Sequence, residues 1–458
     1  MGGVQHQMPN SIDRGTTNGQ ISDMTSDGSE TGRRRLGLPT LTGLVVANMI
    51  GAGAFTTSGF ALNDLGSPFW VMLAWAVGGA IAFCGALCYG ALSRYVAESG
   101  GEYLFLSRVV HPLIGFVAGW VSLVAGFTGA IAFAALAFEA YIQPLLPIEL
   151  PGGLLAIVLV LVGALIHGVR LSIGTGIQNV AVVIKLVLIF AFLAIVVLAT
   201  GLTTPSTAAV PLTPFSIVTF SSSLVWISLS YSGYNAAVYV AGEALDARER
   251  VPKAMWVGTL LVSAIYICLN ATFVYLVPFD VVAGKPDVAA AAAQYVGGAP
   301  LALLVRSIIG ISLLTSVFAM LMIGPRVYAR MAEDNLFPKF FRFNGDVPTA
   351  AIVLQAGAAI LLIVFTTLKD LLSYLGLTLS LCAALTVSCV FLLRTRMRGE
   401  FTIPGYPVVP GFFILATIVL AILSTIRSPI EIVATLVTFA SGAVLYFVFS
   451  RKSSVNIP

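Results

Sequence analysis

Long apolar runs recur along almost the whole chain, and each is long enough to cross a lipid bilayer as a helix. A helix needs about 20 apolar residues to span a hydrocarbon core about 30 Å thick. Because these runs show no alternating β pattern, helices are the spanning structure that satisfies every backbone polar group in lipid. The sequence predicts an all-α membrane protein with twelve transmembrane helices, at residues 38–62, 68–93, 112–141, 152–169, 173–200, 214–241, 253–277, 301–328, 349–368, 371–393, 408–426 and 430–450.

Composition excludes several other classes of protein. Of the 458 residues, 58% are hydrophobic and 10% are charged, whereas a soluble chain carries about 25% charged residues. The five cysteines all lie in apolar runs, which argues against a disulfide framework, and their spacing suits no metal site. The sequence contains no nucleotide-binding loop and no Ser-His-Asp arrangement. It therefore predicts a protein of the lipid bilayer that is not an enzyme, needs no cofactor and binds no nucleic acid.

Lysine and arginine set the expected orientation, because they accumulate on the cytoplasmic side of membrane proteins. With the N-terminus inside, 19 of the 24 basic residues fall in inner segments, four in outer segments, and Lys185 within a span. This segregation predicts a multi-pass protein of the plasma (inner) membrane with both termini in the cytoplasm. Residues 1–35 are polar and are predicted to form a disordered tail, and residues 451–458 a cytoplasmic C-terminus.

Glycine interrupts two of the predicted helices near the middle of the membrane. The first helix carries Gly51 and Gly53, and the sixth carries Gly233. The sixth helix starts five spans after the first, and an odd number of spans inverts a repeat. Interruptions at corresponding positions of two repeats point to a transporter binding site. The chain is predicted to consist of two inverted five-helix repeats and two further helices, at residues 36–200, 214–396 and 397–450.

An interrupted helix can bind a zwitterion. The unwound turn frees backbone N–H groups, and the half-helix that follows points its positive dipole end at the same place, so a carboxylate can bind there. Freed carbonyl oxygens on the other side can accept hydrogen bonds from an ammonium group. The competing interpretation is that these glycines only allow close helix packing. The matched pair of interruptions favours a binding site.

Four motifs, in order along the twelve spans, give the sequence its resemblance to a known family. They are MIGAGAFT at residues 49–56, GGEY at 100–103, YSGYN at 231–235 followed by Glu243 and Val251-Pro252, and GPRVY at 324–328 followed by Asp334 and Pro338. Over residues 36–450 the chain resembles the amino acid–polyamine–organocation (APC) superfamily, and within it the L-type amino-acid transporter branch.

The resemblance implies a LeuT-type fold and a site between spans one, three, six, eight and ten that opens alternately to each side. It assigns the substrate carboxylate to the first break and the ammonium group to carbonyls at both breaks. The residues so assigned are Gly51 with the N–H groups of Ala52 and Gly53 for the carboxylate, the carbonyls of Met49, Leu229 and Ser232 for the ammonium group, and Gly233, Tyr234 and Asn235 for the unwound sixth span.

Two departures from that branch affect the expectations. Leu229 stands where the branch usually carries an aromatic gate. The identity of the side chain that occludes the site is therefore left open, with Trp226 and Tyr231 as candidates. The loop at residues 143–153 lacks the cysteine by which animal members bind a glycoprotein heavy chain. The chain is therefore expected to have no disulfide-linked heavy-chain partner.

Lys185 is the one charge deep within a predicted span. A lysine at mid-membrane is costly, by about 2.5–3.5 kcal/mol on insertion scales, and is therefore a functional candidate, although snorkelling to the interface is the alternative. In relatives that resemble this chain, a fifth-span lysine bridges spans one and eight where sodium-coupled members hold a cation. Lys185 is therefore expected to be a coupling residue without sodium dependence, and both proton symport and exchange stay open.

Charged residues elsewhere suggest no acidic partner for a cationic substrate, because no Asp or Glu lies mid-span. The charged run after span six is interpreted as a solvated loop, with an ion pair from Glu243 to Arg94 or Arg326 as the alternative. The pocket candidates that can be named are small or neutral, namely Gly126, Thr128, Ser312 and Ser316. These observations favour neutral amino acids as substrates.

The predicted function is secondary active transport of amino acids, as a permease or exchanger. One alternative keeps the fold and changes the substrate to polyamines or other organic cations, which would leave the N–H groups at Ala52 and Gly53 unpaired. A second alternative is a non-transporting membrane sensor, but a sensor usually adds a soluble output domain, and neither terminus is long enough to form one.

Overall fold

The computed structural model describes residues 36–51, 53–169, 171–200, 214–285, 287–343, 348–397, 401–427 and 429–452. The predicted N-terminal tail, the segment at 201–213, residues 453–458 and Ala52 lie outside these ranges. Within them the chain is helical, apart from turns and an isolated β-bridge between Leu36 and Ala244. The compact unit begins at Arg35 and contains all the described helices.

The first half of the chain begins with a helix that is broken in its middle. The break separates α1 (Leu38–Met49) from α2 (Gly53–Leu65). The elements that follow are α3 (Pro68–Tyr95), α4 (Gly101–Val109), α5 (Pro112–Val121), the π-helical η1 (Ser122–Gly129), α6 (Ala130–Ile142), the short η2 (Gln143–Leu145), α7 (Leu154–Val169) and α8 (Leu171–Thr200).

The second half of the chain also begins with a helix that is interrupted part of the way along its length. The break separates α9 (Ile217–Ser230) from the 3₁₀ segment η3 (Ala236–Glu243). Gly298, at φ +64°, kinks the longest element, α12. The remaining elements are α10 (Ala247–Tyr275), α11 (Phe279–Val282), α12 (Val288–Glu333), η4 (Lys339–Phe341), α13 (Thr349–Phe365), α14 (Leu368–Arg396), α15 (Val408–Arg427) and α16 (Pro429–Lys452).

Seven helical segments of the described chain are long and apolar enough to cross a membrane, and five shorter apolar helices accompany them. Each of the twelve predicted ranges overlaps one of these segments. Large apolar side chains such as Leu165, Leu198 and Ile430 are exposed on the helices, as expected of surfaces that face lipid. The chain is a multi-pass helical membrane protein.

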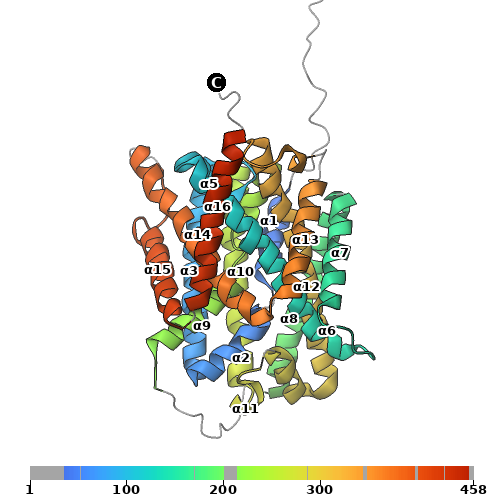
Figure 1. Cartoon of the computed structure of the whole chain (residues 1–458). Coiled ribbons are helices and arrows are strands. Elements are labelled where there is room, and N and C mark those ends of the chain that lie inside the picture. Colours follow the sequence, from blue (N-terminus) through green and yellow to red (C-terminus); the bar gives the residue numbers. More distant parts are fainter. Residues whose placement is uncertain are drawn as a thin grey trace, which may run out of the picture. The chain divides into compact units, whose positions relative to one another are not determined.

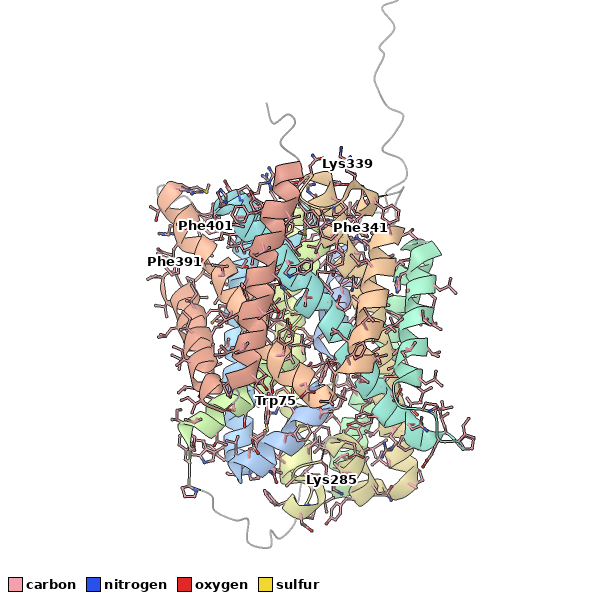
Figure 2. The ribbon with its side chains drawn as sticks, in the orientation of Figure 1. Trp75, Lys285, Lys339, Phe341, Phe391 and Phe401 are labelled. Atoms are coloured by element: carbon pink, nitrogen blue, oxygen red, sulfur yellow. The ribbon has the colours of Figure 1, made fainter. Side chains whose placement is uncertain are left out.

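The long helices run side by side, so the ends of the bundle are well separated (Figure 1). Lys339 lies at one end and Lys285 at the opposite end (Figure 2). We call the first the basic end, because Arg330 in the last turn of α12, Lys339 in η4 and Arg342 just after it lie close together in the sequence there.

The two broken helices lie together inside the bundle. The half-helix α2 contacts α9, and α1 contacts η3, so each half of one broken helix meets the opposite half of the other. α3 and α10 pack along each other, and α10 also packs along α1. The breaks are thereby surrounded by other helices and shielded from lipid, which is the setting in which non-helical backbone at membrane depth is tolerated.

Candidate functional site

The first broken helix loses its hydrogen-bond ladder at Ile50. The Ile50 N–H still bonds to Val46 O, but the Ile50 backbone then leaves the helical region, at φ −77° and ψ 85°. The Gly51 N–H bonds instead to Met49 O at 2.8 Å. The helix resumes at Gly53, so the first N–H groups of α2 have no partner within the helix and point into the break.

The second broken helix loses its ladder after Ser230. The Ser232 N–H bonds to Leu229 O at 2.9 Å, in a tight turn. Gly233 then adopts φ +100°, a conformation that residues with a Cβ atom rarely adopt. Regular structure resumes at Ala236 as a 3₁₀ helix.

Glycine lets the two breaks touch. A Cβ atom on Gly233 would lie 2.8 Å from the carbonyl carbon of Asn48, and one on Gly53 would overlap the Ser230 hydroxyl. Gly51 is different, because a Cβ there would lie 3.8 Å from Ser316 Oγ, in ordinary contact. Gly53 and Gly233 are therefore required by packing, and packing does not explain Gly51.

A cavity of about 170 Å³ lies where the breaks meet. Of the assigned substrate residues, the cavity is lined by Met49, Gly51, Gly53, Leu229, Ser232, Gly233, Tyr234 and Asn235, while Ala52 lies outside the described residues. Further walls come from α3, η1, α6, α12, α14 and α15, with Ile81, Phe127, Phe133, Met320, Leu379 and Phe413 among the lining side chains. Tyr231 lines the cavity and Trp226 does not, so Tyr231 is the better placed of the two candidate gates.

The carbonyl of Met49 is a poorer ammonium acceptor than expected. It already accepts hydrogen bonds from the Gly51 N–H and from the Tyr266 hydroxyl, which use both of its lone pairs. The same Tyr266 hydroxyl lies 3.0 Å from Ser230 O and so joins the ends of α1 and α9. Tyr266 is a positioning residue that the sequence analysis missed.

The π-helical turn of the third span widens the helix beside the cavity. It brings Ser122, Gly126 and Phe127 to the cavity wall, a use of π-helix often seen at functional sites. Of the other predicted pocket residues, Thr128 and Ser312 are buried but do not line the cavity. Ser316 acts indirectly, since its hydroxyl contacts the carbonyls of Ala47 and Ile50 at 3.1 Å each.

Lys185 lies against the first break. Its side chain is fully buried, and its Nζ donates a hydrogen bond to Ile50 O at 3.0 Å. Ser316 of α12 contacts the same carbonyl, so α8 and α12 both hold the point where α1 unwinds. Lys185 does not snorkel to the membrane surface, and its ammonium group contacts the backbone of the break.

Glu102 is an acidic residue at the cavity that the sequence analysis missed. It belongs to α4, between two spanning helices, yet its side chain is only 6% exposed and lines the cavity. Its Oε1 accepts hydrogen bonds from Tyr89 (3.0 Å) and Asn235 (2.5 Å), and its Oε2 accepts one from Tyr239. The expectation drawn from the sequence concerned acids within the spans, and Glu102 reaches the cavity from outside them.

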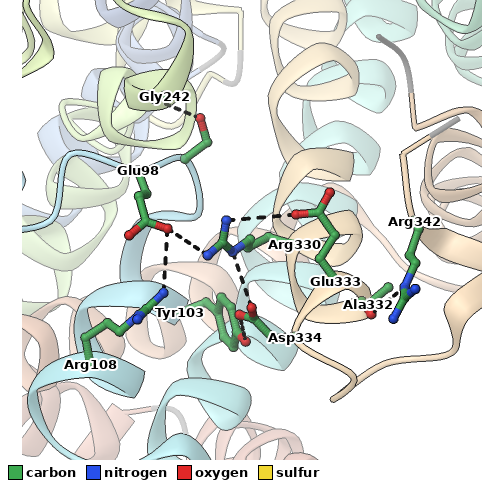
Figure 3. Close-up of polar contacts among 10 residues, drawn as sticks. Glu98, Tyr103, Arg108, Gly242, Arg330, Ala332, Glu333, Asp334 and Arg342 are labelled. Carbon is green, nitrogen blue, oxygen red and sulfur yellow. Dashed lines mark hydrogen bonds and ion pairs between the residues drawn. The ribbon is translucent and has the colours of Figure 1, made fainter. Parts of the chain in front are cut away.

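A network of charged side chains connects the spans at the basic end (Figure 3). Arg330 of α12 pairs with Glu98 at 2.7 Å, and Arg108 of α4 approaches the same carboxylate at 3.6 Å. Asp334 accepts a hydrogen bond from Tyr103 at 2.5 Å. The network ties α12 to the segment between α3 and α5, and so holds this end of the bundle together.

A second ion pair lies deeper on the same side. Arg326 is 3% exposed, and its Nε lies 2.6 Å from Glu243 Oε1. This pair corrects the interpretation of Glu243 as part of a solvated loop, and it joins η3 to α12. Arg94, the other candidate partner, lies instead over the ring of Trp256.

We expect the substitution Glu243→Gln to destabilise the protein by about 3 kcal/mol, because it leaves the buried Arg326 without its counter-charge. Asp246→Asn is the matched control, since Asp246 pairs with Arg250 at the surface and such pairs contribute about 0–1 kcal/mol. Denaturant unfolding in detergent measures both. Equal, small losses in the two variants would contradict the importance of the buried pair.

Known proteins resemble this chain over most of its length. The amino acid permease family model matches residues 36–449. A serine/threonine exchanger, SteT, of Bacillus subtilis is 25% identical over 446 residues, covering 92% of this chain and 98% of its own. The large neutral amino acids transporter small subunit 2 of Rattus norvegicus is 24% identical, covering 84% and 75%. The human b(0,+)-type amino acid transporter 1 is 23% identical, covering 91% and 88%.

The family match and the relatives extend over nearly all the described helices, including both breaks and the cavity between them. The chain belongs to the amino acid permease family of membrane transport proteins.

Proposed function

We propose that this amino acid transporter carries neutral amino acids by alternating access at the cavity between the two breaks. The observation that carries the proposal is the meeting of the two breaks, Gly53 against Ser230 and Gly233 against Asn48, at a cavity whose lining is neutral apart from Glu102 among the described residues. An amino acid is the ligand that offers both a carboxylate and an ammonium group to two interrupted helices. A polyamine offers no carboxylate and would leave the N-terminus of α2 unpaired.

The carboxylate binds at the start of α2. Gly53 begins this helix and lines the cavity, so the positive end of the helix dipole faces the cavity. The ammonium group binds at the end of α9, centred on Ser232, because Met49 O is already fully bonded within the protein. The side chain of the substrate then faces the apolar wall that includes Phe133 and Leu379.

Glu102 at the cavity does not change the proposed preference for substrates with neutral side chains. Both of its oxygens already accept hydrogen bonds from the protein, so the carboxylate is not presented as a partner for a cationic side chain. The names of two relatives, a large neutral amino acids transporter and a serine/threonine exchanger, support the same substrate class.

The proposed transport cycle opens the two ends of the bundle in turn. We place the basic end in the cytoplasm, together with both termini, and assign the chain twelve spans, with the first ten forming an inverted repeat in the plasma membrane. Opening the cytoplasmic end separates α12 from the segment between α3 and α5, which breaks the Arg330–Glu98 pair. Lys185 couples this motion to the first break through Ile50, and the absence of a cysteine at residues 143–153 supports transport without a disulfide-linked heavy chain.

Competition binding tests the substrate class. Purified protein is incubated with radiolabelled leucine or alanine and an excess of unlabelled leucine, alanine, arginine, lysine or spermidine. We expect the neutral amino acids to displace the label at least about tenfold more effectively than the cationic compounds, because the cavity offers a cationic side chain no free acidic partner. Stronger displacement by arginine, lysine or spermidine would overturn the assignment.

A further inference from the structure

Glu102 combines three properties that the proposed transport cycle leaves unexplained. It is buried, it lines the cavity, and it holds the second half of a broken helix. The three hydrogen-bond donors come from two spans. Tyr89 belongs to α3, while Asn235 lies in the unwound turn of the sixth span and Tyr239 in η3. A movement of η3 away from α4 must therefore break bonds to this carboxyl group.

The glycines before Glu102 place it in this position. Gly100 and Gly101 both have positive φ, at +150° and +58°, and turn the chain into α4. A Cβ on Gly101 would overlap the ring of Tyr239. The Gly-Gly turn thus allows α4 to approach η3 closely enough for the Glu102 carboxyl to reach the Asn235 amide and the Tyr239 hydroxyl.

The neighbours of Glu102 are polar but uncharged. They are Tyr89 of α3, Tyr234 and Tyr239 of the broken sixth span, and Cys382 of α14. On α12 the nearby charges are already paired, Arg326 with Glu243 and Arg330 with Glu98. Within the described part of the chain, no lysine or arginine forms an ion pair with Glu102.

Burial without a counter-charge raises the pKa of Glu102, against the hydrogen bonds from Tyr239, Tyr89 and Asn235, which lower it. If the basic end opens and η3 moves, water reaches the carboxyl group and its pKa returns toward the ordinary value. A proton therefore binds more tightly in the arrangement seen here than in the open one. By linkage, proton binding stabilises this arrangement, and that stabilisation is lost as the pH rises through the raised pKa.

We propose that Glu102 is a proton-binding site coupled to the position of η3, which takes up a proton when the basic end closes over the cavity and releases it when that end opens. This inference rests on the proposed transport function and adds to it a site distinct from Lys185. The step involves only the transfer of one proton between water and the carboxyl oxygen. The hydrogen bond from Asn235, next to Tyr234 in the unwound turn, links that proton to the substrate cavity.

The test is the pH profile of amino-acid exchange in proteoliposomes at equal pH on both sides, from about pH 4.5, near the ordinary pKa of a glutamate, to about pH 8. We expect the wild-type rate to change by about tenfold across this range and the Glu102→Gln variant by less than about twofold, because glutamine keeps the shape but cannot titrate. Tyr89→Phe removes one donor to the carboxylate, so the midpoint of its profile should move to higher pH. Asp370→Asn, an exposed carboxyl at a helix N-terminus, should keep the wild-type profile.

The outcomes separate the inference from the proposed function. Absence of exchange by the wild-type protein at every pH contradicts the transport function itself. Exchange with a flat wild-type profile, or with a profile that Glu102→Gln leaves unchanged, overturns the proton site while leaving transport intact. If Glu102→Gln does not fold, the Tyr89→Phe profile decides, since an unshifted midpoint contradicts the role of Glu102.

Discussion

Replacing Gly233 by alanine is expected to lower the transport rate by more than about tenfold, because the left-handed backbone conformation and the lack of space both exclude a side chain. Gly233 has φ +100°, and its missing Cβ would lie 2.8 Å from the Asn48 carbonyl carbon. The substitution pushes the two breaks apart at the cavity. Initial rates of exchange in proteoliposomes measure the effect, with Gly357→Ala as the control, since a Cβ on Gly357 would meet no atom within 4 Å.

A rescue experiment distinguishes loss of this contact from general misfolding. Gly53→Ala should also reduce transport, because its Cβ would overlap the side chain of Ser230. Combining it with Ser230→Gly removes the overlapping atoms and should restore part of the rate. If Gly233→Ala transports like the wild-type protein, or if the double variant is no better than Gly53→Ala, contact between the breaks is not needed for transport.

Replacing Lys185 by methionine is expected to reduce transport by roughly tenfold to a hundredfold, the effect of losing one charge-assisted hydrogen bond. The Nζ atom donates to Ile50 O, the carbonyl at which α1 unwinds, and methionine of similar length cannot donate. The variant should keep its fold, because methionine fills the same apolar space. Exchange rates measured with and without a proton gradient give the reduction in transport. They also show whether the Lys185→Met variant loses proton-driven uptake.

The control for this substitution is Lys253→Met, on the exposed surface of α10, which should transport at the wild-type rate. A proton gradient that still drives uptake in Lys185→Met would assign Lys185 a structural role. An unchanged rate in Lys185→Met would contradict its role in coupling altogether. A requirement for sodium in the wild-type protein would contradict the interpretation of Lys185 as the occupant of a cation site.

The sequence predicts the helical membrane fold and the positions of both breaks for a simple physical reason. Gly53 and Gly233 lack a Cβ atom, and this weakens the helix locally. The break can therefore be predicted from the glycines in the sequence. The length of each apolar run similarly fixes which segments can span lipid. The number of crossings and the inverted repeat stay predictions, because they depend on how the shorter helices sit in a membrane.

The residues that sequence reasoning misplaced depend on tertiary packing. Glu102 lies between two spans in the sequence, and it reaches the cavity because α4 folds back against Tyr239. In the sequence, nothing distinguishes Tyr266 from the other tyrosines in apolar spans. Its role follows from the packing of α10, which brings its hydroxyl to the carbonyls of both breaks. Thr128 and Ser312 were expected at the cavity, but in spans that are apolar on every side the sequence does not fix which face turns inward.

The central claim is tested most directly by uptake of a radiolabelled neutral amino-acid mixture into proteoliposomes of the purified protein. Vesicles are prepared with and without internal amino acid, and with and without a proton gradient. We predict accumulation of label, driven either by internal substrate, as in an exchanger, or by the proton gradient, as in a symporter. No accumulation under any of these conditions, by protein that is folded and oriented in the vesicles, would contradict the assignment of the cavity as a neutral amino-acid transport site.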